Sequence, residues 1–68
     1  MNISKPYDFL NQLLGKEAQI KLKDGTMIKG KVLAFDVHMN LVVQLQEELS
    51  QRYIFIRGDS LMFVERIE

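Results

Sequence analysis

Gly30 stands in the middle of the longest strand-like run of the chain, and this position constrains the fold most. The run extends over residues 26–35 and is rich in apolar side chains. A glycine inside a strand often marks a sharp bend or a close approach of two backbones. A strand that bends at its middle belongs to two faces of a sheet at once, which is how small barrels close. The sequence therefore predicts a strongly curved sheet.

A short helix is predicted over residues 5–14, before the strands. Pro6 suits the first helical turn, Ser4 is the expected cap, and Gly15 should end the helix in the left-handed conformation. Four apolar residues fall at helical spacing and form one stripe: Phe9, Leu10, Leu13 and Leu14. Because a helix this short is unstable alone, the stripe must lie on the sheet.

Four further strands are expected, over residues 17–23, 40–46, 53–57 and 61–67. Asp24-Gly25 predicts a type I′ hairpin turn, which needs positive φ at both central residues. Residues 47–51 form a polar connector, and Gly58-Asp59 forms a second tight turn. The last two strands should include edges of the sheet. Their apolar runs carry no lysine or proline to discourage pairing with another chain.

The predicted fold class is mainly β, with one domain over residues 1–68. It consists of an N-terminal α-helix on a strongly bent, five-stranded antiparallel open barrel of the SH3-like kind. A domain of this size buries only about 60% of its unfolded surface. The hydrophobic content of 47% is high for so small an interior. Self-association, in which copies bury apolar surface and strand edges against one another, explains this content.

The charges of the chain limit what it binds. Nine basic and nine acidic residues cancel, which argues against a purely electrostatic nucleic-acid binder and requires a concentrated site. All six lysines lie in residues 1–31. Four of them flank one predicted hairpin, where contact with phosphates and simple solvation are both open: Lys21, Lys23, Lys29 and Lys31.

The residues that catalysis or metal binding would need are absent from the sequence. There is no cysteine, one histidine, no glycine-rich phosphate loop and no metal-ligand spacing. We therefore expect no enzymatic activity, no metal and no cofactor. No apolar run approaches the ~20 residues that span a bilayer, and no secretory leader is recognisable. A cytoplasmic protein without membrane contact is expected.

Two short segments gather groups that suit a nucleic-acid base. The first is Asp36-Val37-His38-Met39-Asn40, and the second is Arg57-Gly58-Asp59. His38 and Arg57 are planar groups that can lie against a base. Asn40 carries a donor and an acceptor on one amide, which suits the edge of a pyrimidine. Together the segments indicate binding of single-stranded RNA.

With these segments in place, the chain resembles the Sm and Sm-like proteins, in particular the archaeal ones. The first family motif resembles Gly30 followed by residues 36–42, and the second resembles Ile56-Arg57-Gly58-Asp59 followed by residues 61–64. The resemblance covers nearly the whole chain. It implies the Sm fold and a homo-oligomeric ring, usually of seven subunits with six as the alternative. The fourth strand of one subunit would pair with the fifth strand of the next.

The resemblance also implies binding of uridine-rich single-stranded RNA near the central pore, in RNA processing or ribonucleoprotein assembly. His38 would stack on the base, Arg57 would cover its other face, and Asn40 would read the uracil edge. Asp59 would hold Asn40 or the loop in place, and Asp36 would brace the first loop.

Simpler roles for these residues stay open. His38 could be a solvated loop residue, Asn40 could cap a turn, and Arg57 could form a surface ion pair with Asp59. Gly58 is expected to be structural and to leave space above the Arg57 guanidinium, and Met39 is expected in the core. The alternative function is an SH3-like protein-interaction barrel without RNA specificity. That function would need a groove of exposed aromatic residues.

Overall fold

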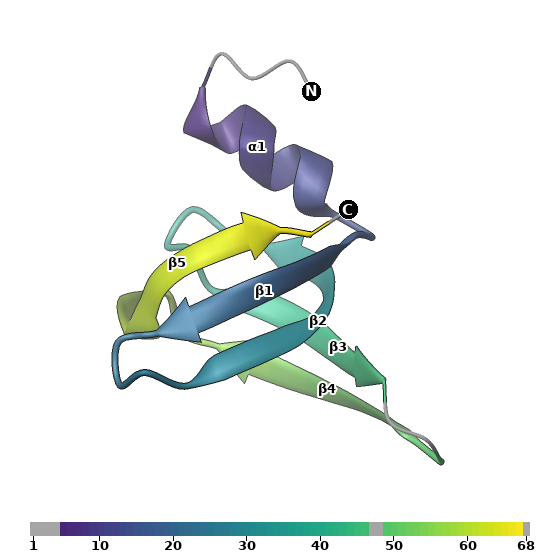
Figure 1. Ribbon diagram of the computed structural model, residues 1–68. Coiled ribbons are helices and arrows are strands. Elements are labelled where there is room, and N and C mark those ends of the chain that lie inside the picture. Colours follow the sequence, from purple (N-terminus) through teal and green to yellow (C-terminus); the bar gives the residue numbers. More distant parts are fainter. Residues whose placement is uncertain (1–4, 47–48, 68) are drawn as a thin grey trace.

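A computed structural model describes residues 5–46 and 49–67 of the chain. It confirms the predicted order of one helix followed by five antiparallel strands (Figure 1). The elements are α1 (Pro6–Leu13), β1 (Glu17–Leu22), β2 (Met27–Phe35), β3 (Leu41–Gln46), β4 (Gln51–Ile56), a 3-10 turn (Gly58–Ser60) and β5 (Leu61–Arg66).

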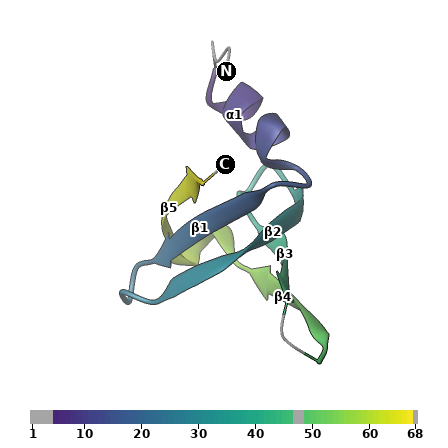
Figure 2. The ribbon, with the colours of Figure 1, turned by 45° about the vertical axis from the view of Figure 1, so that its right-hand side comes forward.

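The strands form one curled sheet in the order β4-β3-β2-β1-β5, with every neighbouring pair antiparallel. β4 and β5 are therefore its two edges, as predicted. The register shifts between Lys21 and Leu22 and between Val32 and Ala34, where irregularities of this kind increase bending. Figures 1 and 2 show the resulting curvature and place α1 at one end of the curled sheet.

Gly30 allows two backbones to approach closely within β2. A Cβ atom added there would lie 2.6 Å from Val43 Cγ1 and 2.7 Å from the carbonyl oxygen of Gln44. Both distances are shorter than real Cβ contacts, so a side chain at this position would force β2 and β3 apart. The prediction of a close backbone approach at Gly30 is confirmed.

The core consists of two buried clusters that share Val64 as a half-buried neighbour. The first lies inside the curled sheet and contains Ile20, Leu41, Val43 and Ile56. The second lies beneath the helix and contains Leu13, Ala18 and Val32, with Phe9 and Leu10 packed against it. The apolar stripe of the helix therefore does lie on the sheet, although Leu14 is 41% exposed.

The ends of α1 differ from the predicted ends by one residue each. The helix begins at Pro6 with Lys5 in the cap position, where the Lys5 N–H donates to the Asp8 carboxylate at 3.2 Å. Ser4, the expected cap, lies outside the described residues. Gly15 has a φ of 78°, so the left-handed end is as predicted.

The hairpin between β1 and β2 is not of type I′. Gly25 has a φ of 94°, but Asp24 does not have a positive φ. The Gly25 N–H donates to the Leu22 carbonyl at 2.9 Å, and the Leu22 N–H donates to Thr26 at 2.9 Å. The loop therefore has three residues rather than two, a length that needs one left-handed residue at its end.

β4 begins at Gln51, two residues earlier than predicted. Gln51 and Arg52 continue the ladder by pairing with Gln46 and Leu45 of β3. Polar composition alone did not reveal this pairing, because both residues lie on exposed parts of an edge strand.

Gly30→Ala should lower the free energy of unfolding by about 1–3 kcal/mol, because the added methyl group overlaps Val43 and the Gln44 backbone. The measurement is urea unfolding at one fixed protein concentration. Gly25→Asn is the matched control, since nothing lies within 4 Å of its Cβ and asparagine tolerates left-handed backbone. Equal unfolding midpoints for the two variants would contradict the role assigned to Gly30.

Candidate nucleic-acid interface

The Asp36 carboxylate holds the loop between β2 and β3. Its Oδ1 accepts the backbone N–H groups of His38 at 2.9 Å and Asn40 at 3.0 Å, and its Oδ2 accepts from Asn40 Nδ2 at 3.0 Å. The pKa of Asp36 lies below its ordinary value, and the largest cause is the hydrogen bond from the Asn40 side chain. The backbone N–H groups of Asn40 and His38 lower the pKa further, whereas desolvation of the carboxylate acts in the opposite direction. Asp36 thus braces the loop, as expected.

The Asn40 amide is fixed at both of its ends. Nδ2 donates to Asp36, and Oδ1 accepts the backbone N–H of Gly58 at 2.8 Å. A carboxylate only accepts and an N–H only donates, so the two ends of the amide cannot exchange places. One N–H of Nδ2 and one lone pair of Oδ1 remain for a ligand.

Arg57 and Asp59 form an ion pair in the second loop. Arg57 Nη2 lies 3.1 Å from Asp59 Oδ2, and the two side chains are 73% and 66% exposed. Of the two expected roles of Asp59, holding Asn40 or holding the loop, the first is wrong, because the Gly58 N–H bonds to Asn40. The bond from Arg57 to Asp59 lies within the second loop and agrees with the other role. A backbone donor could not be identified from residue types. The exposed ion pair contributes little stability but limits where the guanidinium points.

The two loops meet because β3 and β4 are adjacent. Leu41 at the start of β3 pairs with Ile56 at the end of β4. The residues before Leu41 and after Ile56 therefore lie at the same end of these two strands. Gly58 permits a very close approach there. A Cβ on Gly58 would collide with the His38 carbonyl oxygen and lie 2.9 Å from the Met39 carbonyl carbon.

A concavity of about 330 Å³ lies between the loops. Four predicted site residues line it, together with one residue that sequence analysis missed: His38, Asn40, Arg57, Asp59 and Phe55. Phe55 is 63% exposed and lies two residues before Arg57, which directly follows β4 in extended conformation. Alternation along the predicted strand 53–57 would have placed both residues on one face. Asp36 and Gly58 do not line this concavity, but both form hydrogen bonds with the Asn40 side chain, which does.

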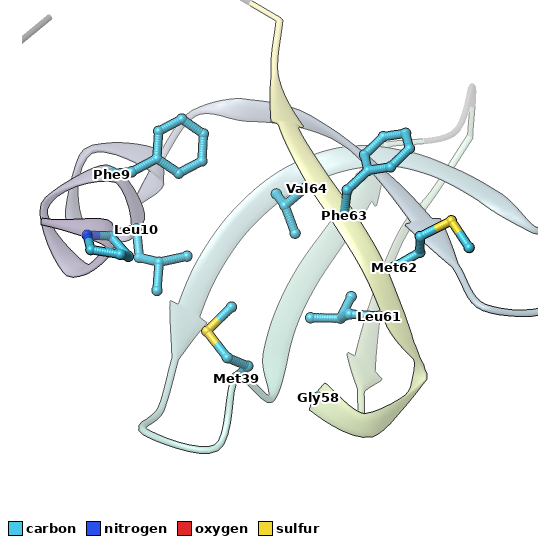
Figure 3. Close-up of a pocket in the computed structure, with 9 residues that line it drawn as sticks. Phe9, Leu10, Met39, Gly58, Leu61, Met62, Phe63 and Val64 are labelled. Carbon is cyan, nitrogen blue, oxygen red and sulfur yellow. The ribbon is translucent and has the colours of Figure 1, made fainter. Parts of the chain in front are cut away.

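Met39 is not a core residue. Its φ of 65° is left-handed, and its half-buried side chain points into a groove between α1 and β5 (Figure 3). This turn of the backbone separates Met39 from its neighbours His38 and Asn40, which line the concavity instead. Nothing in the residue types signals a left-handed methionine.

Two features are absent from residues 5–46 and 49–67. No helix there is long and apolar enough to cross a membrane. No cluster of three or more histidine, aspartate or glutamate side chains there could hold a metal ion. Among the hairpin lysines, Lys23 lies beside Asp59 and Ser60, and its N–H donates to the Ser60 carbonyl at 2.8 Å.

Comparison with known proteins gives one consistent family. Residues 8–66 match the LSM domain. An snRNP Sm-like protein of Methanococcoides burtonii is 35% identical over 68 residues, covering 90% of this chain and 94% of that protein. The LSM complex subunit lsm6 of Schizosaccharomyces pombe is 33% identical over 72 residues, covering 96% of each chain.

A solved structure supports the same assignment. The Pyrococcus abyssii Sm protein, determined in complex with a uridine heptamer, superimposes with a TM-score of 0.80 at 27% identity. The superposition covers 94% of this chain and 100% of the other. The helix and the five curved strands are thus those of a solved Sm protein.

The bonds to Asp36 should respond to acid. The folded-state pKa is lowered, so these bonds are present at neutral pH and are lost as the pH falls through the lowered pKa. The backbone amide signals of His38 and Asn40 in an NMR titration should therefore shift with a midpoint below that of aspartate in an unstructured peptide.

Asp36→Asn should abolish that transition. The matched control is Asp24→Asn, because Asp24 accepts the Thr26 N–H at 2.9 Å and its pKa is lowered by that bond, yet it lies in the β1–β2 hairpin. The control should leave the His38 and Asn40 signals unchanged. A midpoint at or above the peptide value would show that the three bonds do not form in solution.

Proposed function

We propose that this chain, which belongs to the LSM-domain family of Sm-like proteins, is an RNA-binding protein whose copies close into a ring. It binds uridine-rich single-stranded RNA at the pore, in RNA processing or ribonucleoprotein assembly. The observation that carries this proposal is the Asn40 amide, fixed between the Asp36 carboxylate and the Gly58 N–H. A related protein of known structure was determined with a uridine heptamer, which supports the same ligand class.

The fixed amide distinguishes bases by their hydrogen-bonding edge. Uracil presents O4 to the remaining N–H of Asn40 Nδ2 and N3–H to the remaining lone pair of Oδ1. Cytosine and adenine in the same pose present a donor where uracil has an acceptor, and an acceptor where uracil has a donor. Because Asp36 and Gly58 prevent the amide from turning over, Asn40 cannot adapt to those bases. Selectivity for uridine follows.

The planar groups of the concavity would hold the base by stacking. His38 and Arg57 both line it, one from each loop, and Asp59 restrains the guanidinium. Stacking of a base on such groups contributes about 1–3 kcal/mol. Phe55 adds an exposed aromatic surface beside Asn40. This arrangement gives each of the predicted residues a role in binding or in positioning.

The ring follows from the two free strand edges. β4 and β5 each pair on one side, and each carries exposed apolar residues: Tyr53 and Phe55 on β4, Met62 and Phe63 on β5. Pairing of β4 with the β5 of another copy is a head-to-tail contact, which closes into a ring when its rotation allows. Seven subunits are expected, with six as the alternative. A relative that is an LSM complex subunit supports multi-subunit assembly.

We propose no catalytic step, in keeping with a family that is not enzymatic in general. We also place the protein in the cytoplasm. Nothing in the comparisons favours the alternative of an SH3-like protein-interaction barrel. The two most exposed aromatic side chains among the described residues, Tyr53 and Phe55, lie on the edge strand β4, and Phe55 also lines the concavity.

Asn40→Ala should weaken binding of oligouridylate by about 1–3 kcal/mol per occupied site, because two base-edge hydrogen bonds are lost. Fluorescence titrations of the parent with oligouridylate, oligocytidylate and oligoadenylate at one salt concentration supply the comparison. Asn11→Ala, an exposed asparagine on α1, is the control and should bind like the parent. Equal affinity of the parent for oligouridylate and oligoadenylate would refute the proposed specificity.

Met62→Lys should raise the concentration at which the ring dissociates by roughly tenfold or more, because a charge on an edge strand opposes pairing. Met62 is 57% exposed on β5. Met27→Lys is the matched control, since Met27 is 45% exposed but lies on β2, between β1 and β3. Native mass spectrometry over a dilution series measures both variants. A parent protein that stays monomeric at micromolar concentration would rule out the ring.

A further inference from the structure

An apolar groove of about 490 Å³ lies behind the base-binding concavity, between α1 and β5 (Figure 3). The helix contributes Phe9 and Leu10, and β5 contributes Leu61 and Val64. The remaining wall is formed by Met39 and Gly58, which belong to the two loops of the concavity. The groove is thus in direct contact with the loops that carry the base-binding residues.

Met39 is the residue that joins the groove to the base-binding loop. A bulky side chain with a φ of 65° is unfavourable and persists only where its surroundings impose it. The left-handed turn sends the Met39 side chain into the groove, toward the space between Leu10 and Leu61 in Figure 3. His38 and Asn40, on either side of it, face the concavity. The position of Met39 therefore sets the position of both base-contacting residues.

Gly58 lines the groove and holds Asn40, which lines the concavity. Its N–H holds Asn40 Oδ1 at 2.8 Å, and it lies so close to residues 38–39 that a Cβ would reach within 2.9 Å of the Met39 carbonyl carbon. A shift of Met39 therefore presses on Gly58 and disturbs the bond that orients the Asn40 amide. The packing of Met39 in the groove therefore affects the orientation of the Asn40 amide through Gly58.

A second copy of this chain is the occupant that fits the groove. The groove is continuous with β5, whose outer edge is unpaired among the described strands. A strand added at that edge lays alternate side chains over the groove. β4, the other free edge of the sheet, supplies such a side chain, because Tyr53 is 63% exposed and does not line the concavity.

We propose that Met39 couples subunit docking to base recognition: the neighbouring copy covers the groove, fixes the Met39 side chain there, and so presets His38 and Asn40 for a uridine. This inference rests on the RNA-binding function proposed above and adds a regulatory contact to it. The coupling is reciprocal, since anything that fixes the Met39 side chain in the groove favours both events. Uridine-rich RNA therefore stabilises the ring, and a subunit outside the ring binds uridine weakly.

Three substitutions at Met39 separate side-chain packing from backbone conformation. Met39→Leu keeps an apolar side chain in the groove, Met39→Ala removes it, and Met39→Gly removes it while making positive φ favourable. Val37→Ala is the matched control in the same loop, because Val37 is 85% exposed and does not line the groove. Oligouridylate affinity is measured on rings verified by native mass spectrometry. Ring dissociation on dilution is then measured with and without oligouridylate.

We expect Met39→Ala and Met39→Gly to bind oligouridylate about tenfold more weakly than the parent, within the usual range of coupling between sites. Met39→Leu and Val37→Ala should bind like the parent. Oligouridylate should delay dissociation of the parent and Met39→Leu rings, and should have little effect on the Met39→Ala ring.

The opposite results overturn the inference. Intact Met39→Ala rings that bind oligouridylate as tightly as the parent would show that the groove does not act on the base site. Restored binding in Met39→Gly would assign the effect to backbone strain alone. A parent that binds equally well as a monomer would exclude the second copy as the occupant. A parent that binds no oligouridylate under any condition would instead refute the proposed function itself.

Discussion

The hydrogen bond from the Gly58 N–H to the Asn40 side chain connects the two halves of the molecule's binding surface. It joins loops that are 18 residues apart in the sequence. Pairing of Leu41 with Ile56 brings the loops together, and the bare backbone of Gly58 lets them touch. The Asp36 carboxylate completes the restraint from the other end of the amide. In the proposed function, an amide with both ends fixed would select among bases, whereas a free asparagine would accept several of them.

The small core explains why the loops that carry the concavity also border an apolar groove. Two clusters of four and three buried residues hold the described part of the chain together, while large apolar side chains on β4 and β5 stay exposed. A domain of this size buries only part of its apolar surface, and both edges of its sheet stay unpaired within the described chain. The edges and the groove therefore need another chain, and the residues nearest to them, Met39 and Gly58, are also those behind the base site. Assembly and recognition use adjacent parts of the same loops.

The sequence predicted those features that depend on the type of a single residue or on alternation. Gly30 indicated the close approach in β2, Gly15 the end of the helix, and the period of apolar residues gave every strand of the described chain within two residues. The features that it missed depend on which groups happen to meet in space. The Gly58 N–H, not Asp59, bonds to Asn40, and a backbone donor carries no sequence signal. The left-handed conformation of Met39 depends on packing against Gly58 and the groove, so the residue type gave no warning.

The charges around the concavity determine which part of an RNA can enter it. Arg57 contributes one positive charge, while Asp36 and Asp59 contribute two negative charges within hydrogen-bonding distance of the site residues. A phosphate placed on this surface would be repelled by the carboxylates, whereas an uncharged base meets stacking surfaces and an oriented amide. Three of the hairpin lysines lie along β1 and β2, and Lys23 follows β1 and lies beside Asp59 in a separate hollow. The site therefore favours an RNA whose bases point inward and whose backbone stays outside. In the proposed arrangement, specificity would come from Asn40 and would not require a net positive charge.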